Sequence, residues 1–197
     1  MKSSGEQITS RDNARLKHAR TVRDGRIEGE IFVEGLRLAE EAAQFLDITD
    51  FFYTPEFAET ERGEKLLKNL HKFNRAAVSQ KLLESISNMK TPQGVVLLAR
   101  KPQTGKEILE KKLKSISTPL FVVLHELNNP ANAGAILRTA EAAGVAGAIL
   151  TRKSADVFSP KSLRGAMGAA FRLPLWTNAD FDEAINFFRA NKIKNKF

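Results

Sequence analysis

Three residues at helical spacing are the clearest candidates for chemistry: Asn132, Gly134 and Arg138. They follow an apolar run that ends at Leu124 and a polar turn, and their helical pattern stops at Gly144. In a parallel sheet, the turn beyond the carboxyl end of a strand is where ligands bind. Arg138 lies four residues after Gly134, one turn further along the helix and on the same side. This order of elements places the Arg138 guanidinium where a ligand could bind.

Each of these residues also has a purely structural interpretation. Asn132 stands at the predicted helix start, where its side-chain amide could cap free N–H groups. Gly134 could allow another backbone, rather than a ligand, to approach closely. An unpaired arginine beside apolar residues is costly, but an ion pair between Arg138 and Glu141 or Glu126 would remove that cost. Taken singly, the three residues leave both interpretations open.

The rest of the sequence excludes several other kinds of site. The chain contains no Cys, which excludes a disulfide framework, a thiolate zinc site and a cysteine nucleophile. Its histidines, His18, His71 and His125, have no second histidine or carboxylate at metal-ligand spacing, so no metal site is predicted. The sequence also holds neither a nucleophile elbow nor a phosphate-binding glycine loop.

The composition predicts a soluble globular protein. Of the 197 residues, 42% are apolar and 27% are charged, which is too apolar for a disordered chain. No apolar run approaches the ~20 residues that a membrane-spanning helix needs. Because no apolar stretch of a secretory signal follows Met1, we expect a cytoplasmic protein.

The charge of the chain favours a polyanionic partner. Thirty-one Lys and Arg residues against 23 Asp and Glu residues give a net charge of +8. Basic residues gather near the N-terminus, in the segment 101–114 and between Arg152 and Arg172. Such charge attracts nucleic acid through counterion release and steering. A merely solvated basic surface remains the alternative.

Alternating strand and helix patterns predict an α/β fold. The first helix is expected to begin after Ser10 as its N-cap and to bury Leu16, Ala19 and Val22. In the first half of the chain, the further predicted strands are Glu30–Glu34, Ile48–Tyr53, Ala76–Ser79 and Gly94–Ala99, and the helices are Leu36–Phe45, Glu61–Phe73 and Gln80–Ser87. In the second half, the strands are Phe121–Glu126, Gly147–Leu150 and Phe171–Trp176, and the helices are Ala133–Ala143, Ser159–Met167 and Phe181–Ala190.

Several segments of the chain together carry a resemblance to one family. In the second half these are Asn132-x-Gly134-x-x-x-Arg138-Thr-Ala and Ser159-Pro-Lys-Ser-Leu-Arg-Gly-Ala-Met-Gly-Ala-Ala-Phe-Arg-Leu-Pro174. In the first half they are Ile8-Thr-Ser-Arg-Asp-Asn, Gly29-Glu-Ile-Phe-Val-Glu-Gly35 and Thr91-Pro-Gln-Gly94. The chain resembles, over nearly its whole length, the SpoU/TrmH branch of the SPOUT RNA methyltransferases.

The resemblance implies a fold, a division of the chain and an activity. Residues 1–100 would form an α/β RNA-binding domain like those of ribosomal proteins, and 101–117 a basic linker with a short amphipathic helix. Residues 118–197 would form the first half of an α/β-knot (SPOUT) domain with a parallel sheet. The implied activity is transfer of a methyl group from S-adenosylmethionine to a ribose 2′-hydroxyl of RNA, expected to be ribosomal, by a homodimer.

The resemblance also implies roles for particular residues. Arg138 would be catalytic by stabilising the negative charge that develops on the hydroxyl and by orienting the phosphate–ribose unit. It is a poor general base because the pKa of an arginine is about 12 or higher. Asn132 would shape the same pocket, and Gly134 and Arg164 would support the motifs. The candidates for contact with RNA phosphates are Arg11, Arg20, Arg23 and Arg37.

Two departures from the family pattern change what we expect. Ala166 stands where the family has Ser or Thr, so no hydroxyl is carried over there. The family's other two signature motifs, which form the knotted S-adenosylmethionine pocket and much of the dimer interface, are not found in Trp176–Phe197. We therefore expect a chain truncated at its C-terminus, with the cofactor-binding residues downstream of Phe197 and no tight cofactor binding. The alternatives are a truncated, non-catalytic RNA-binding protein and a nucleotide-binding α/β protein unrelated to RNA.

Overall fold

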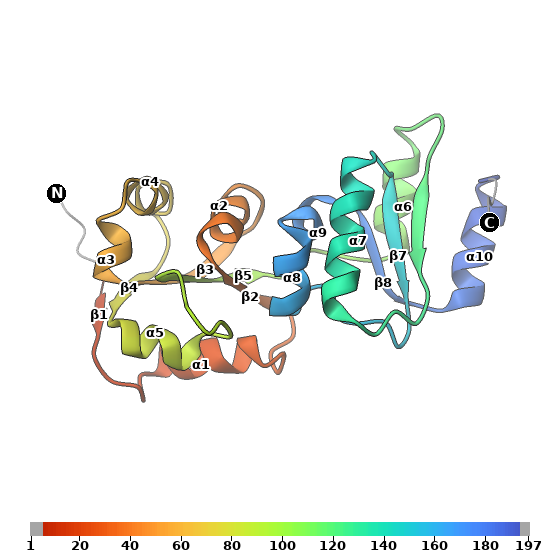
Figure 1. The fold of residues 1–197 in the computed structure, drawn as a ribbon. Coiled ribbons are helices and arrows are strands. Elements are labelled where there is room, and N and C mark those ends of the chain that lie inside the picture. The colour runs from red at the N-terminus through yellow and green to blue at the C-terminus, as the bar shows by residue number, and fades with distance from the viewer. Residues whose placement is uncertain (1–5, 194–197) are drawn as a thin grey trace.

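Two β-sheets, placed one after the other along an elongated molecule, organise the fold (Figure 1). The computed structural model describes residues 6–193. A five-stranded sheet lies in residues 6–100 and a three-stranded sheet in residues 121–179. This architecture confirms the predicted α/β class. We call the parts built on these sheets the first and the second unit.

The first sheet is mixed. Its strands are β1 (Glu6–Ile8), β2 (Glu30–Glu34), β3 (Ile48–Tyr53), β4 (Arg75–Val78) and β5 (Val95–Arg100). They lie in the order β1-β4-β3-β5-β2, in which β4 is parallel to both neighbours and β5 is antiparallel to both of its own. All of β5 except Arg100 is buried, because helices cover both faces of the sheet.

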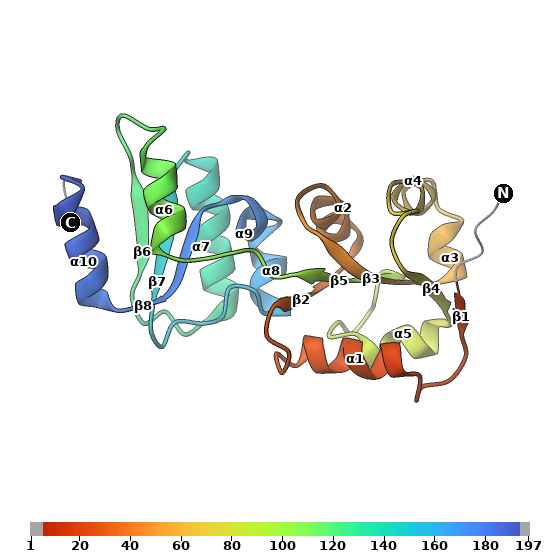
Figure 2. The same ribbon diagram turned by 180° about the vertical axis from the view of Figure 1, so that it is seen from behind.

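The helices of the first unit form one layer on each side of this sheet. Helices α1 (Ala14–Arg23) and α5 (Gln80–Ile86) lie on one side, and α2 (Leu36–Phe45), α3 (Pro55–Ala58) and α4 (Glu61–Asn69) lie on the other (Figure 2). The predicted apolar side of α1, formed by Leu16, Ala19 and Val22, packs against Phe32 and Phe52 of the sheet. No helix within residues 6–193 is long and apolar enough to cross a membrane.

Helix α1 begins later than predicted, so Ser10 as its N-cap is wrong. The N-cap is Asn13, whose side chain accepts the backbone N–H of Arg15 at 2.9 Å. Ser10 instead stabilises the preceding turn, since its hydroxyl accepts the N–H of Asp12 at 3.2 Å. Both residue types are good caps, so residue type alone does not decide between them.

The second sheet contains only parallel strands, as predicted. Its strands β6 (Phe121–Leu124), β7 (Gly147–Thr151) and β8 (Leu175–Ala179) lie in that order. Helices α7 (Pro130–Ala142), α8 (Pro160–Ala166) and α9 (Ala169–Arg172) lie toward one face. Helices α6 (Lys106–Leu113) and α10 (Phe181–Ala190) cover the other, where Leu109 and Phe187 pack against Ile149 and Trp176.

Two segments of the second half differ from the sequence-based expectation or extend it. The predicted strand Phe171–Trp176 is wrong in its first part: Met167 and Gly168 have positive φ angles of 49° and 90°, which end α8 and start the short helix α9. The helix predicted within 101–117 is present as α6. Its Leu109 is fully buried, so this basic segment packs onto the second unit.

The two units share a hydrophobic core. The largest apolar cluster includes Leu38 and Ala39 of α2 together with Ala169 and Phe171 of α9. Arg172, at the end of α9, pairs with Glu41 of α2 and, at 2.6 Å, with Glu141 of α7. The second unit is therefore held against the first by both apolar and charged contacts.

Candidate active site

The turn between β6 and α7 is stabilised by a different asparagine from the one predicted. Asn129 is the N-cap of α7, and its side chain accepts the N–H groups of Ala131 at 3.0 Å and Asn132 at 3.2 Å. Pro130 follows in the first helical turn, where its missing N–H costs nothing. The prediction that Asn132 caps the helix is therefore wrong. Its side chain is left exposed inside the first turn.

Gly134 marks the point where α7 crosses α8. A Cβ atom at Gly134 would lie 2.2 Å from the carbonyl oxygen of Ser162 and 3.0 Å from the Cα of Gly165. A Cβ at Gly165 would in turn lie 3.0 Å from the carbonyl oxygen of Ala131. The two helices thus touch backbone to backbone, and another backbone is what approaches Gly134. Ala166, the departure from the family pattern, is fully buried beside this crossing.

Arg138 is free to meet a ligand. Its side chain is exposed, whereas its neighbour Leu137 is fully buried in the core. Neither expected partner binds it, because Glu141 pairs with Arg172 and Glu126 lies 3.4 Å from Lys153. Within residues 6–193, Arg138 makes no hydrogen bond and no ion pair. An exposed cation on a helix fixed by a tight crossing is suited to holding an anionic group.

Asn132 and Arg138 do not share one side of α7. They are six residues apart, which separates their side chains by about 120° around an ideal helix. Asn132 lies nearer the polar turn, and Arg138 nearer the middle of the helix. The structure therefore gives both residues exposed side chains but does not bring them into contact.

Two other arginines, Arg15 and Arg172, form ion pairs with carboxylates inside the fold. Arg15 binds Asp50 of β3, and the hydrogen bond to that carboxylate raises the pKa of Arg15 above its ordinary value. The pKa of Arg172 is raised in the same way, first by its hydrogen bond to Glu141. Arg138 differs from both in forming no ion pair with a carboxylate of residues 6–193.

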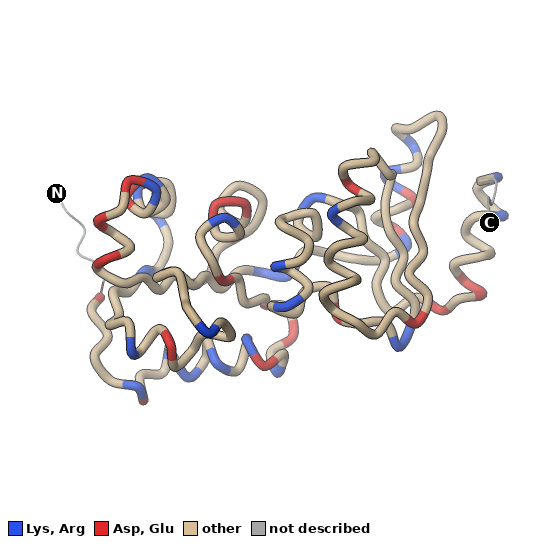
Figure 3. Tube along the Cα trace, in the orientation of Figure 1, with Lys and Arg blue, Asp and Glu red and all other residues tan. Residues whose placement is uncertain are grey.

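The predicted RNA-contacting arginines fall into different settings. Arg11 and Arg37 are exposed and have no side-chain partner within the described chain. Arg20 donates to the carbonyl of Arg11 at 2.9 Å. Arg23 is mainly structural, since it binds Asp24 and donates to the carbonyl oxygens of Ile86 and Ser87, each at 3.3 Å. Figure 3 shows basic residues on α1 and on α2, which lie across the first sheet from each other, so Arg37 cannot join the other three on one surface.

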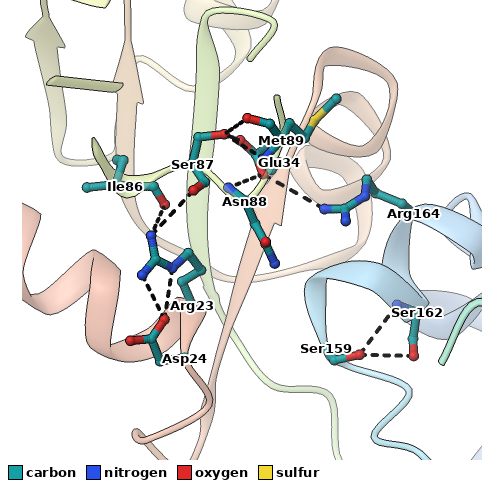
Figure 4. Close-up of polar contacts among 10 residues, drawn as sticks. All are labelled: Arg23, Asp24, Glu34, Ile86, Ser87, Asn88, Met89, Ser159, Ser162 and Arg164. Carbon is teal, nitrogen blue, oxygen red and sulfur yellow. Dashed lines mark hydrogen bonds and ion pairs between the residues drawn. The ribbon is translucent and has the colours of Figure 1, made fainter. Parts of the chain in front are cut away.

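Arg164 lies at the junction between the units, opposite a carboxylate that sequence reasoning missed. Its Nη1 atom is 3.9 Å from Oε2 of Glu34, at the end of β2 (Figure 4). Glu34 also accepts the backbone N–H of Asn88 at 3.0 Å and the hydroxyl of Ser87. The available signal was an acidic residue ending a strand that is otherwise apolar from Ile31 to Val33.

Comparisons with known proteins match both units. Residues 119–195 match the SpoU rRNA Methylase family, and residues 13–97 match the MRM3-like substrate binding domain. The mitochondrial rRNA methyltransferase 3A of Danio rerio is 32% identical over 179 residues, which are 90% of this chain and 40% of that protein. The chain thus spans about two fifths of the length of this curated relative. This coverage leaves the expected truncation a prediction.

Solved structures of methyltransferases are also similar to this chain. The SpoU methyltransferase AviRb of Streptomyces viridochromogenes, in complex with AdoMet, has a TM-score of 0.78 and 25% identity over 91% of this chain and 68% of that one. A structure described as an RNA 2′-O ribose methyltransferase has a TM-score of 0.74 and 26% identity over 94% of this chain and 70% of that one. Because these proteins are methyltransferases, the comparisons do not favour the alternative of a binding-only protein.

Proposed function

The chain belongs to the SpoU rRNA methylase family, and from this we propose that it acts in S-adenosylmethionine-dependent methylation of a ribose 2′-hydroxyl of RNA. The observation that carries the proposal is the exposed, unpaired guanidinium of Arg138 on a helix held by the Gly134 crossing. We also propose ribosomal RNA as the substrate and a homodimer as the assembly. The names of the relatives support the first, and the resemblance of the motifs supports the second.

The chemistry needs a cation where Arg138 lies. A ribose hydroxyl is a weak nucleophile until the negative charge that develops on its oxygen is stabilised. In the transfer, the 2′-oxygen forms a bond to the methyl carbon, the sulfur–carbon bond breaks, and the hydroxyl proton leaves to solvent. Arg138 stabilises the oxygen's charge and orients the neighbouring phosphate with its planar donor fork. Because arginine stays protonated at neutral pH, it does not remove the proton itself.

The polar groups at the carboxyl ends of β6 and β7 are not assigned to binding of the methyl donor. S-adenosylmethionine, when bound, supplies the methyl group on a positively charged sulfur. At the carboxyl ends of β6 and β7, the hydroxyl of Thr151 already accepts the N–H of Glu126 at 3.0 Å and lies 3.2 Å from Nδ1 of His125. These polar groups bind one another, so we do not assign them to the cofactor.

A methyl-transfer assay tests the proposal. Tritiated S-adenosylmethionine, at a concentration high enough to offset weak cofactor binding, and ribosomal RNA are incubated with the wild-type chain and with Arg138→Ala, Arg138→Lys and Arg189→Ala. Arg189, an exposed arginine on α10, lies on the far side of the second sheet and is the matched control. Loss of a preorganised charged donor is expected to lower kcat by about 10²- to 10³-fold in Arg138→Ala. Arg138→Lys keeps the charge without the fork and should fall in between.

The product and the binding step give two further readouts. A methylated 2′-oxygen cannot attack the adjacent phosphate, so the modified linkage should resist alkaline cleavage. Equal transfer by Arg138→Ala and Arg189→Ala would refute the assigned role of Arg138. RNA binding with a steep salt dependence, but no transfer by the wild-type chain, would favour the binding-only alternative instead.

A further inference from the structure

A buried carboxylate lies between the two units. The side chain of Glu34 is 1% exposed, although Glu34 is the last residue of β2 in the first unit. It accepts the hydroxyl of Ser87 and the N–H of Asn88. Both donors are neutral, so they leave the net charge of the carboxylate uncompensated, and a nearby cation would offset the cost of burying it.

The compensating cation comes from the second unit. Among the described residues, Arg164 of α8 is the only cation that forms an ion pair with Glu34, at 3.9 Å between Nη1 and Oε2. That Nη1 atom is itself buried and makes no hydrogen bond, and Glu34 is its one ion-pair partner among the described residues. The two pairs Arg164–Glu34 and Arg172–Glu41 differ in their carboxylates: the Glu34 side chain is 1% exposed and that of Glu41 is 36% exposed, so water and salt screen the charge of Glu34 less.

The contacts continue into both units. Arg23 of α1 donates to the carbonyl oxygens of Ile86 and Ser87, and the same turn donates to Glu34 (Figure 4). On the other side, Gly165 follows Arg164 directly and forms the backbone crossing with Gly134 of α7. A continuous series of polar and packing contacts therefore links α1 to the helix that carries Arg138.

We propose that Arg164 is a positioning residue: through its ion pair with Glu34 it fixes the first unit, which binds the RNA, at one orientation relative to Arg138. The inference deepens the proposed function and rests on it. Arg164 itself touches neither the RNA nor the methyl donor. Its contribution is to keep the bound ribose within reach of α7, because small displacements of a reacting group reduce the rate steeply.

Distances between spin labels test the orientation without any need for activity. The chain has no Cys, so cysteines placed at Lys65 of α4 and Lys112 of α6, both exposed, carry the only labels. The distance distribution should be narrow in the wild type and broader in Arg164→Met and in Glu34→Gln. The double variant should be no broader than either single variant, because both remove one interaction. Lys161→Met, an exposed position on the same helix, is the control and should leave the distribution unchanged.

Kinetics supply the second readout. In Arg164→Met, kcat should fall about 10- to 100-fold while the KM for RNA stays within about twofold, because the first unit itself is unaltered. Arg164→Lys keeps the charge and should recover part of kcat and of the narrow distribution. Melting curves check that each variant is folded. If an Arg164 variant does not fold, Glu34→Gln removes the same ion pair and is measured instead.

The outcomes separate this proposal from the previous one. An unchanged distance distribution in Arg164→Met, or an equal effect of Lys161→Met, would overturn the positioning role. Absence of methyl transfer by the wild type would count against the proposed function, whereas the label distances would still decide what Arg164 does.

Discussion

Replacing Gly134 by alanine tests the backbone crossing that holds the Arg138 helix. The new Cβ atom would lie 2.2 Å from the carbonyl oxygen of Ser162 and 2.9 Å from the backbone nitrogen of Ala166. Both are backbone atoms of α8, so no side chain can rotate out of the way. Since carbon and carbonyl oxygen approach to roughly 3.3 Å at closest, the helices must separate by about 1 Å.

Two opposing contributions determine how Gly134→Ala changes the free energy of unfolding. Alanine in a helix interior is favoured over glycine by ~1 kcal/mol, which would stabilise the variant. Overpacking a tight contact costs ~1–3 kcal/mol, and here backbone has to move. Because backbone has to move, we expect a cost in the upper part of that range, ~2–3 kcal/mol, and so a net loss of ~1–2 kcal/mol. For a chain of this size, that loss lowers Tm by about 2–8 °C.

Thermal unfolding followed by circular dichroism measures the difference. Ala135→Gly, at the exposed neighbouring position of the same helix, is the matched control and should lose ~1 kcal/mol through helix propensity alone. The sign of the Gly134→Ala change is therefore decisive. A variant as stable as the wild type, or more stable, would show that α7 and α8 are not in tight backbone contact.

Further predictions concern the caps, the core and the charged surface. Asn129→Ala should cost ~1 kcal/mol of stability in urea unfolding, and Asn132→Ala close to nothing, because Asn129 is the N-cap. Leu109→Ala should cost ~2–5 kcal/mol, because this side chain is fully buried in the second unit; a near-neutral urea midpoint would contradict the packing of α6. Arg11→Ala should weaken RNA binding and reduce the slope of log K against log salt by about 1 with unchanged melting, as filter binding can measure. Arg23→Ala should instead lower the melting temperature, because Arg23 holds the turn at Ser87.

Much of the fold follows from local patterning. The strands Glu30–Glu34 and Ile48–Tyr53 and the helices Leu36–Phe45 and Phe181–Ala190 have the bounds expected from their apolar periodicity. The strand–turn–helix order around Arg138 is likewise present, because apolar spacing and a capping residue are properties of a few neighbouring residues. The strand predicted over Phe171–Trp176 is wrong in its first part, since Gly168 permits the turn that ends α8 but does not show that a helix rather than a strand follows it.

The functions of individual polar residues depended on contacts between distant segments. Periodicity places Arg23, Arg138 and Arg164 on helices. It cannot distinguish an arginine that binds carbonyl oxygens, such as Arg23, from one whose side chain is exposed to solvent, such as Arg138. The pairing of Arg172 with Glu41 joins residues 131 positions apart, and the pairing of Arg164 with Glu34 likewise joins the second unit to the first. A side chain's partners are set by which surfaces meet when the layers pack, and that information is spread over the whole chain.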